Sequence, residues 1–127
     1  CPGCKRRDRE IAQLRSEVGQ LRKMVEEDHA LLDDPSALSR ANRRFHKMIH
    51  LASHNRYLVQ QLDLVHRTMA LMATTSLAVE GRGAIALQEH SAIVEAIAKR
   101  DEDCAYRALK SHISEAFETR LRLSADS

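Results

Sequence analysis

Residues 11–25 read IAQLRSEVGQLRKMV, and apolar side chains recur along them at intervals of three and four residues. The recurring positions are Ile11, Leu14, Val18, Leu21 and Val25. Such spacing gathers the apolar side chains on one face of a helix, so we predict an amphipathic helix from Asp8 to about Glu27. The stripe is too short for a coiled coil, which needs more heptads, and it therefore predicts one face of a helical bundle.

The rest of the chain repeats this pattern and is poor in helix-breaking residues, with 4 Gly and 2 Pro. Further apolar stripes run through Leu38, Ala41, Phe45, Met48 and Ala52; through Leu58, Leu62, Val65, Met69 and Met72; through Ala86, Ile93 and Ile97; and through Ala105, Leu109 and Ala116. Asp34 and Pro35 predict the start of the second helix, and Asn55 predicts that of the third. Residues 80–83 (EGRG) predict the end of the third helix, and Asp101 opens the last.

These patterns predict an all-α fold, an antiparallel bundle of about five helices joined by short loops. One domain should cover residues 8–123, with short tails at 1–7 and 124–127. Cys1 and Cys4 form a C-x-x-C motif without a second pair of ligands, so we assign them to the N-terminal tail. Cys104 is expected to pack as a small hydrophobic residue.

Some leucines lie off the inner stripes of the predicted helices, namely Leu71, Leu77 and Leu87. Apolar side chains outside the core of one chain are often covered by a second copy, so we expect a symmetric homodimer.

The charge of the chain is nearly balanced, with 20 Lys and Arg against 18 Asp and Glu. This balance gives no electrostatic case for nucleic-acid binding, which usually shows a basic stripe. No apolar run approaches the roughly 20 residues that span a bilayer, and the first residues do not resemble a signal peptide. We therefore expect a cytoplasmic protein that does not enter a membrane.

The chain has seven histidines, and their positions are its most informative feature. His90 and His112 each lie on the apolar stripe of their predicted helix, so both should point inward. Asn42 and His46 are four residues apart, which places both on one face of the second helix. Three helices can thus direct three imidazoles and one amide oxygen toward a common interior point.

Two interpretations of these four side chains remain open from spacing alone. A buried imidazole must find partners, because an unsatisfied polar group costs about 1–3 kcal/mol. A divalent metal would satisfy all four, and an i, i+4 pair on one helix is a known ligand geometry. Alternatively, the histidines bond one another and water in a metal-free interaction domain. Of the other histidines, His29 and His54 are expected in solvated turns, and His66 as a partly buried structural residue. His50, one turn beyond His46, could support a metal ligand, but a surface position is the simpler expectation.

Several segments of the chain resemble the FCD domain of GntR-type transcription regulators. They are 42–46 (NRRFH), 53–58 (SHNRYL), 89–97 (EHSAIVEAI), 100–101 (RD) and 112–113 (HI). The resemblance extends from about Asp8 to Leu123, with 44 and then 22 residues between the three inward histidines. It implies an effector domain that dimerises and controls a winged helix-turn-helix on its N-terminal side. That DNA-binding unit is absent from this chain, so we expect DNA contact only through such a unit.

The resemblance also implies a divalent metal held by an Asp/Asn-x-x-x-His pair and two further histidines. These positions correspond to Asn42, His46, His90 and His112. Zinc is the first expectation, with nickel, cobalt or manganese as alternatives. A small carboxylate would complete the metal shell. At the first ligand position, Asn42 replaces the more frequent Asp, which removes one negative charge.

We therefore predict a sensory domain and not an enzyme. Arg67 is a candidate for binding the carboxylate, although an exposed arginine is the simpler interpretation of that residue. A metalloenzyme would need a general base beside its metal-bound water. Glu89 and Glu95 are expected to be solvated, so the sequence offers no such base.

Overall fold

The computed structural model describes residues 1–52, 60, 63–64, 67 and 76–126, and within them the protein is all-α, as predicted. These residues form four long helices, two short 3-10 helices and no strand. The elements are α1 (Pro2–Asp28), η1 (His29–Leu31), α2 (Pro35–Ala52), η2 (Ser76–Ala78), α4 (Arg82–Ala98) and α5 (Glu102–Asp126). Residues 60, 63, 64 and 67 are helical and belong to the predicted third helix. The apolar stripe of that helix and Asn55 lie outside the described residues.

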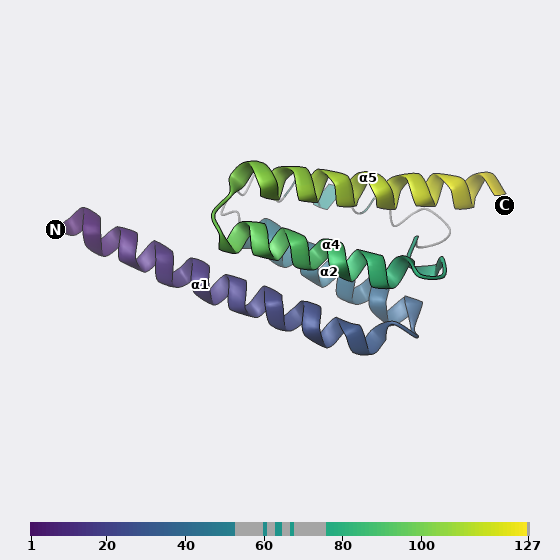
Figure 1. The fold of residues 1–127 in the computed structure, drawn as a ribbon, viewed down its shortest axis with the longest axis horizontal. Helices are drawn as coiled ribbons and strands as arrows, with labels where there is room; N and C mark the ends of the chain where they lie inside the picture. Colours follow the sequence, from purple (N-terminus) through teal and green to yellow (C-terminus); the bar gives the residue numbers. More distant parts are fainter. Residues whose placement is uncertain (53–59, 61–62, 65–66, 68–75, 127) are drawn as a thin grey trace.

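The long helices lie side by side, and α2 and α4 run in the same direction (Figure 1). α1 runs antiparallel to α2 and α4, and α5 runs antiparallel to α4. α4 packs against α1 and against α5, while α1 also packs against α2. The first turns of α1 extend beyond the other helices (Figure 1), and the contribution of α1 to the core begins at the partly buried Leu14 and the buried Val18.

Side-chain caps explain where two of the helices begin. Asp34 Oδ1 accepts a hydrogen bond of 3.0 Å from the Ala37 amide, which confirms the predicted start of α2. Asp101 Oδ1 accepts an equivalent 3.0 Å bond from the Cys104 amide at the start of α5. Between α4 and α5, Arg100 adopts a left-handed φ of 58°, which lets the chain turn back.

Some predicted helix limits were wrong. α1 begins at Pro2 and not at Asp8, because proline suits the first turn of a helix, where its missing N–H is not needed. The residues expected as tails are therefore mostly helical, and α5 likewise reaches Asp126. Residues 80–83 were expected to end a helix, but α4 begins at Arg82. Gly81 precedes it with a φ of 78°, a conformation that glycine adopts without strain.

The apolar stripes predicted for the first two helices form the main core together with α4. Its buried members are Val18, Leu21, Val25, Phe45, Ile49, Ile93 and Val94. Leu21 and Phe45 are completely buried. Met48 and Ile97 pack against this core from partly buried positions. The periodicity therefore located the core, and it fixes which faces of α2 and α4 point inward.

Two expectations about apolar side chains were wrong. Leu77 and Leu87 are buried within the chain, in a second cluster with Leu38 and Ala86, so they are not available to a second copy. Leu71 lies outside the described residues. The exposed large apolar side chains on α5 are instead Tyr106, Phe117 and Leu121. Cys104 is exposed and does not pack in the core.

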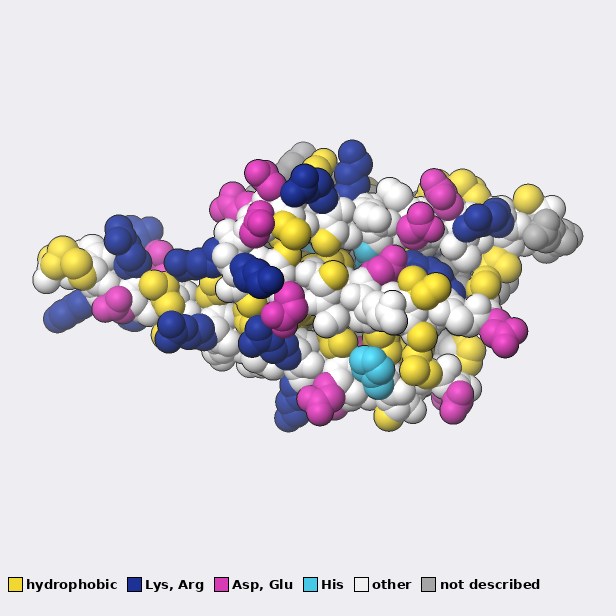
Figure 2. Space-filling view, in the orientation of Figure 1, with side chains coloured by type: hydrophobic (Ala, Val, Ile, Leu, Met, Phe, Trp, Pro, Cys, Tyr) yellow, Lys and Arg dark blue, Asp and Glu magenta, His cyan; other side chains and the backbone are white. Residues whose placement is uncertain are grey.

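The surface charge is unevenly distributed. Figure 2 shows basic side chains gathered over the N-terminal half of α1. Residues 1–23 contain seven Lys and Arg but three Asp and Glu. The balanced charge of the whole chain thus conceals a local basic excess. Within the described residues, no helix has the long apolar run needed to cross a bilayer.

Candidate metal centre

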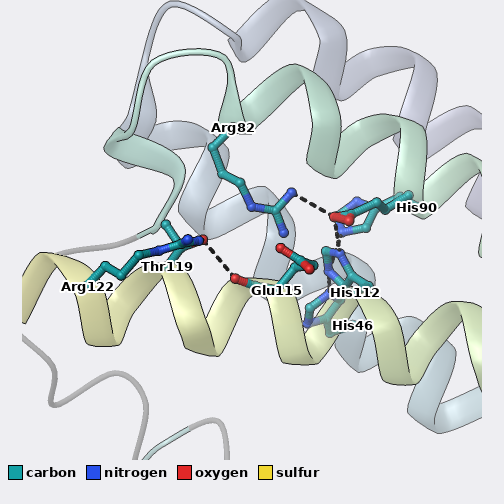
Figure 3. Close-up of polar contacts among 8 residues, drawn as sticks. His46, Arg82, His90, His112, Glu115, Thr119 and Arg122 are labelled. Atoms are coloured by element: carbon teal, nitrogen blue, oxygen red, sulfur yellow. Dashed lines mark hydrogen bonds and ion pairs between the residues drawn. The ribbon is translucent and has the colours of Figure 1, made fainter.

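Three of the predicted ligand residues meet between α2, α4 and α5 (Figure 3). His112 Nε2 lies 2.9 Å from His46 Nε2 and 3.1 Å from His90 Nε2. The candidate ligand atoms of all three residues lie within 4.8 Å of one another. Helix periodicity predicted the inward direction of these imidazoles, and the packing of the helices adds their convergence.

The three imidazoles are almost completely removed from solvent. The exposed fractions of His46, His90 and His112 are 7%, 1% and 2%. The ring of Phe45 stacks on that of His90, with centroids 4.1 Å apart and planes inclined by 18°. The remaining imidazole pairs meet edge to face, at centroid distances of 4.6 to 5.3 Å. The histidine cluster is therefore built into the packing of the bundle.

Glu89 and Arg82 form an ion pair directly beside this cluster. Glu89 Oε1 accepts a 2.9 Å hydrogen bond from His112 Nδ1 and a 2.7 Å bond from Arg82 Nη1. The Arg82 side chain is 8% exposed and that of Glu89 is 22% exposed. The expectation that Glu89 is solvated was therefore wrong. Its position directly before His90 and one helix turn from Ala86 gave a weak signal that it borders the interior face.

Burial lowers the pKa of two of these histidines, His90 and His112. Desolvation, with smaller contributions from His112 and Arg82, lowers the pKa of His90 from 6.5 to about 3. Desolvation also lowers the pKa of His112, although the hydrogen bond from His112 to Glu89 acts in the opposite direction. Neutral imidazole is the form that binds metal ions, and in this form each of the two rings has one nitrogen with a free lone pair at neutral pH.

Asn42 lies one helix turn before His46 on α2. Its Oδ1 atom is buried and has no hydrogen-bond partner among the residues that the structure describes. A buried amide oxygen without a partner costs about 1–3 kcal/mol, so such atoms usually serve a ligand, a water or a function. Asn42 is therefore the member of the predicted set whose oxygen lacks a protein partner in the described part of the chain.

The donor set fits a divalent transition metal. Metal–nitrogen bonds of about 2.0–2.1 Å place two nitrogens on one ion about 2.8–3.4 Å apart, for coordination angles of roughly 90° to 110°. The separations of 2.9 and 3.1 Å between the imidazole nitrogens fall in that range. Three neutral nitrogens and one amide oxygen suit zinc, nickel or cobalt better than magnesium or calcium, which prefer oxygen ligands.

Among the residues that the structure describes, Arg67 and the other histidines that the sequence singled out do not belong to the cluster of His46, His90 and His112. Arg67 is exposed and pairs with Asp63 at 2.9 Å. His29 is exposed, as expected, and its Nδ1 lies 2.8 Å from the Val25 carbonyl oxygen. His50 is buried, with 5% exposure, so the expectation of a surface position was wrong. His54 and His66 lie outside the described residues.

A cavity of about 490 Å³ lies between the start of α4 and the C-terminal half of α5. Arg82 and Glu89 line it from α4, and Thr119 and Arg122 line it from α5. Figure 3 shows Arg82 reaching from the start of α4 into the space between these helices. Because Glu89 also bonds His112, one carboxylate contacts both the cavity and the histidine cluster.

Comparison with known proteins identifies the family of the chain. The family model described as FCD domain matches residues 4–115, which is most of the chain. Among curated proteins, the comparison found no match. The matched region includes the four predicted ligand residues, and it also includes the ion pair of Glu89 and Arg82. The chain therefore belongs to the FCD domain family, the effector-binding domains of GntR-type transcription regulators.

Proposed function

We propose that this domain binds a divalent metal ion through His46, His90, His112 and Asn42, and senses a small organic acid through that metal. The observation that carries the proposal is the convergence of three buried imidazole nitrogens on one point. The unpartnered oxygen of Asn42 adds a fourth donor on the same helix as His46. Zinc is the first expectation, and the nitrogen-rich set supports nickel or cobalt before manganese.

The charge of the proposed ligand set favours an anionic effector. Three neutral imidazoles and an amide leave the double positive charge of the metal uncompensated in a region of low dielectric constant. A carboxylate in the remaining coordination positions would supply the missing charge. Metal and carboxylate should then bind with positive and reciprocal coupling of about 1–3 kcal/mol.

Arg82 is a better candidate than Arg67 for a second contact to the organic acid. Arg82 is buried and lines the cavity beside Glu89, whereas Arg67 is exposed and bonded to Asp63. The Nε atom of Arg82 is buried without a hydrogen-bond partner among the described residues. A planar guanidinium with a free donor is suited to a carboxylate group.

In a regulator, this domain would act as a homodimer in the cytoplasm and control a DNA-binding unit joined to its N-terminal side. The family supports both the dimer and the regulatory role. The exposed apolar residues Tyr106, Phe117 and Leu121 of α5 offer a surface for a second copy. Sedimentation at tens of micromolar protein, roughly the affinity of weak contacts, tests the dimer.

A metal-free sensory or interaction domain is the second candidate. The histidines are within hydrogen-bond distance of one another at 2.9 and 3.1 Å, so the cluster can satisfy itself in part without an ion. In that case metal chelation would change neither the fold nor its stability.

Metal analysis of protein purified without a histidine tag separates the two candidates. We expect about one bound ion per chain, and a melting temperature at pH 7.5 that falls when a chelator removes the ion. Calorimetric titration of zinc, nickel, cobalt and manganese, with and without citrate, should show tighter metal binding when citrate is present. A melting temperature indifferent to chelator, with no metal uptake, would establish the metal-free candidate instead.

A further inference from the structure

We propose that Glu89, held by Arg82, is the positioning residue that fixes the proton of His112 on Nδ1 and so directs the free lone pair of Nε2 at the metal site. This inference rests on the proposed metal function but concerns residues outside the ligand set.

The hydrogen-bond geometry sets the tautomer of His112. A carboxylate oxygen accepts but does not donate, so the 2.9 Å contact between His112 Nδ1 and Glu89 Oε1 requires the proton to be on Nδ1. In a neutral imidazole with Nδ1 protonated, Nε2 carries the lone pair. That Nε2 atom is the one that lies nearest to both His46 Nε2 and His90 Nε2. The His112 ring therefore has the Glu89 carboxylate on its Nδ1 side and the proposed metal position on its Nε2 side.

The two neighbouring histidines on α4 and α5 differ in this respect. His90 Nδ1 is buried without a hydrogen-bond partner among the described residues, so no acceptor there favours a proton on Nδ1. Both histidines are buried, yet within the described part of the chain only His112 of the two has a carboxylate bonded to its Nδ1. We infer that His112 is prepared for metal binding before the ion arrives, whereas His90 adjusts when the ion binds.

Arg82 keeps Glu89 in place and available as an acceptor. The Nη1 atom of Arg82 donates to the same Oε1 atom that accepts from His112, at 2.7 Å. The two donors hold that oxygen from two directions, and the burial of Arg82 limits competition from water. An amide at position 89 would behave differently. If Arg82 takes its oxygen, its NH₂ group faces His112 Nδ1 and selects the tautomer with a protonated Nε2, which cannot bind metal.

The test compares Glu89→Gln with a matched control on the same helix. Glu95 on α4 also forms an ion pair with an arginine, Arg22, at 2.9 Å, but both side chains are about half exposed, and neither belongs to the cluster of His46, His90 and His112. We expect Glu89→Gln to weaken zinc binding about 10- to 100-fold, the range seen when outer-shell partners of metal-bound histidines are removed. Glu95→Gln should bind zinc as the wild type does.

A second readout needs no metal. In the ¹⁵N NMR spectrum of the metal-free wild-type protein, we expect His112 to be protonated on Nδ1 and not on Nε2. In Glu89→Gln the proton should move to Nε2, and in Glu95→Gln it should stay on Nδ1. If Glu89→Gln does not fold, as judged by circular dichroism, the wild-type and Glu95→Gln spectra decide the question alone.

The outcomes separate this inference from the proposed function. Failure of the wild type to take up any metal would refute the proposed function, while the tautomer of His112 would still test the role of Glu89. Equal zinc affinity in wild type and folded Glu89→Gln, or a wild-type His112 protonated on Nε2, would overturn the inference.

Discussion

The interior of the bundle contains two adjoining regions of opposite chemistry. The apolar region joins α1, α2 and α4 through the cluster that includes Leu21 and Phe45. The polar region lies between α2, α4 and α5 and holds three imidazoles and the ion pair of Glu89 with Arg82, and Asn42 lies one helix turn before His46 on α2. The two regions share Phe45, which packs in the core on α2 and stacks on His90 of α4.

This difference separates the residues that stabilise the fold from the residues that we propose to bind a ligand. Apolar side chains need only a complementary shape, so burial of Leu21 or Ile93 stabilises the fold directly. Every buried polar group needs a partner, and the polar region contains several atoms that lack one among the described residues, including Asn42 Oδ1 and His90 Nδ1. A region that costs stability in the metal-free protein is the region in which a ligand would compensate that cost.

The largest expected effect is the loss of unfolding free energy when a large side chain of the apolar region is truncated to alanine. Phe45→Ala should lower the free energy of unfolding by about 3–5 kcal/mol, and Leu21→Ala by about 2–5 kcal/mol. Only Phe45→Ala should also weaken metal binding, because it removes the ring that stacks on His90, whereas α1 contributes no residue to the cluster. Urea unfolding and metal titration of both variants measure this. Equal loss of metal affinity in the two variants would mean that the two regions are not separate.

A smaller effect should appear when the metal-free protein is acidified. Because the folded-state pKa of His90 is lowered to about 3, the unfolded chain binds more protons than the folded chain between about pH 6.5 and pH 3. The unfolding free energy should therefore fall with falling pH in that window, by up to about 1.4 kcal/mol per pH unit for this histidine. Burial lowers the pKa of His112 as well and adds in the same direction.

Urea unfolding in the presence of a chelator, repeated from pH 7.5 to pH 4, measures that slope. The variant His90→Phe, which keeps a flat ring against Phe45, should show a shallower slope than the wild type. An identical slope in both proteins would show that His90 is not the buried neutral group on which the comparison of the two regions depends.

The smallest effect concerns the charge of the polar region. Asn42→Asp places a carboxylate at a buried position, so it should tighten metal binding by about 1–3 kcal/mol and reduce the benefit of citrate. In the metal-free protein the same substitution should destabilise the fold, because a buried carboxylate without a partner is costly. Thermal unfolding measures both effects: Asn42→Asp should raise the melting temperature when metal is present and lower it when metal is absent. A shift in the same direction under both conditions would place Asn42 outside the metal shell.

Much of the fold follows from local sequence. Apolar periodicity predicted the core faces of α1, α2 and α4, and Asp34 and Asp101 predicted two helix starts, because these features depend on residues within one or two helix turns. The limits of α1 and α4 were harder to predict, since a helix can begin at a proline such as Pro2 or directly after a glycine such as Gly81. The off-stripe residues Leu77 and Leu87 were assigned to the surface because periodicity within one helix does not show which neighbours cover its sides.

By itself, the sequence determined that His46, His90 and His112 face the interior, because helical spacing sets the direction of each side chain. Only the tertiary structure decided that their nitrogens converge within 3.1 Å of His112 Nε2, because convergence depends on how three separate helices pack. Packing also decided the role of Glu89. It lies 23 residues from His112 in the chain, and the contact between them exists only because α5 folds back along α4.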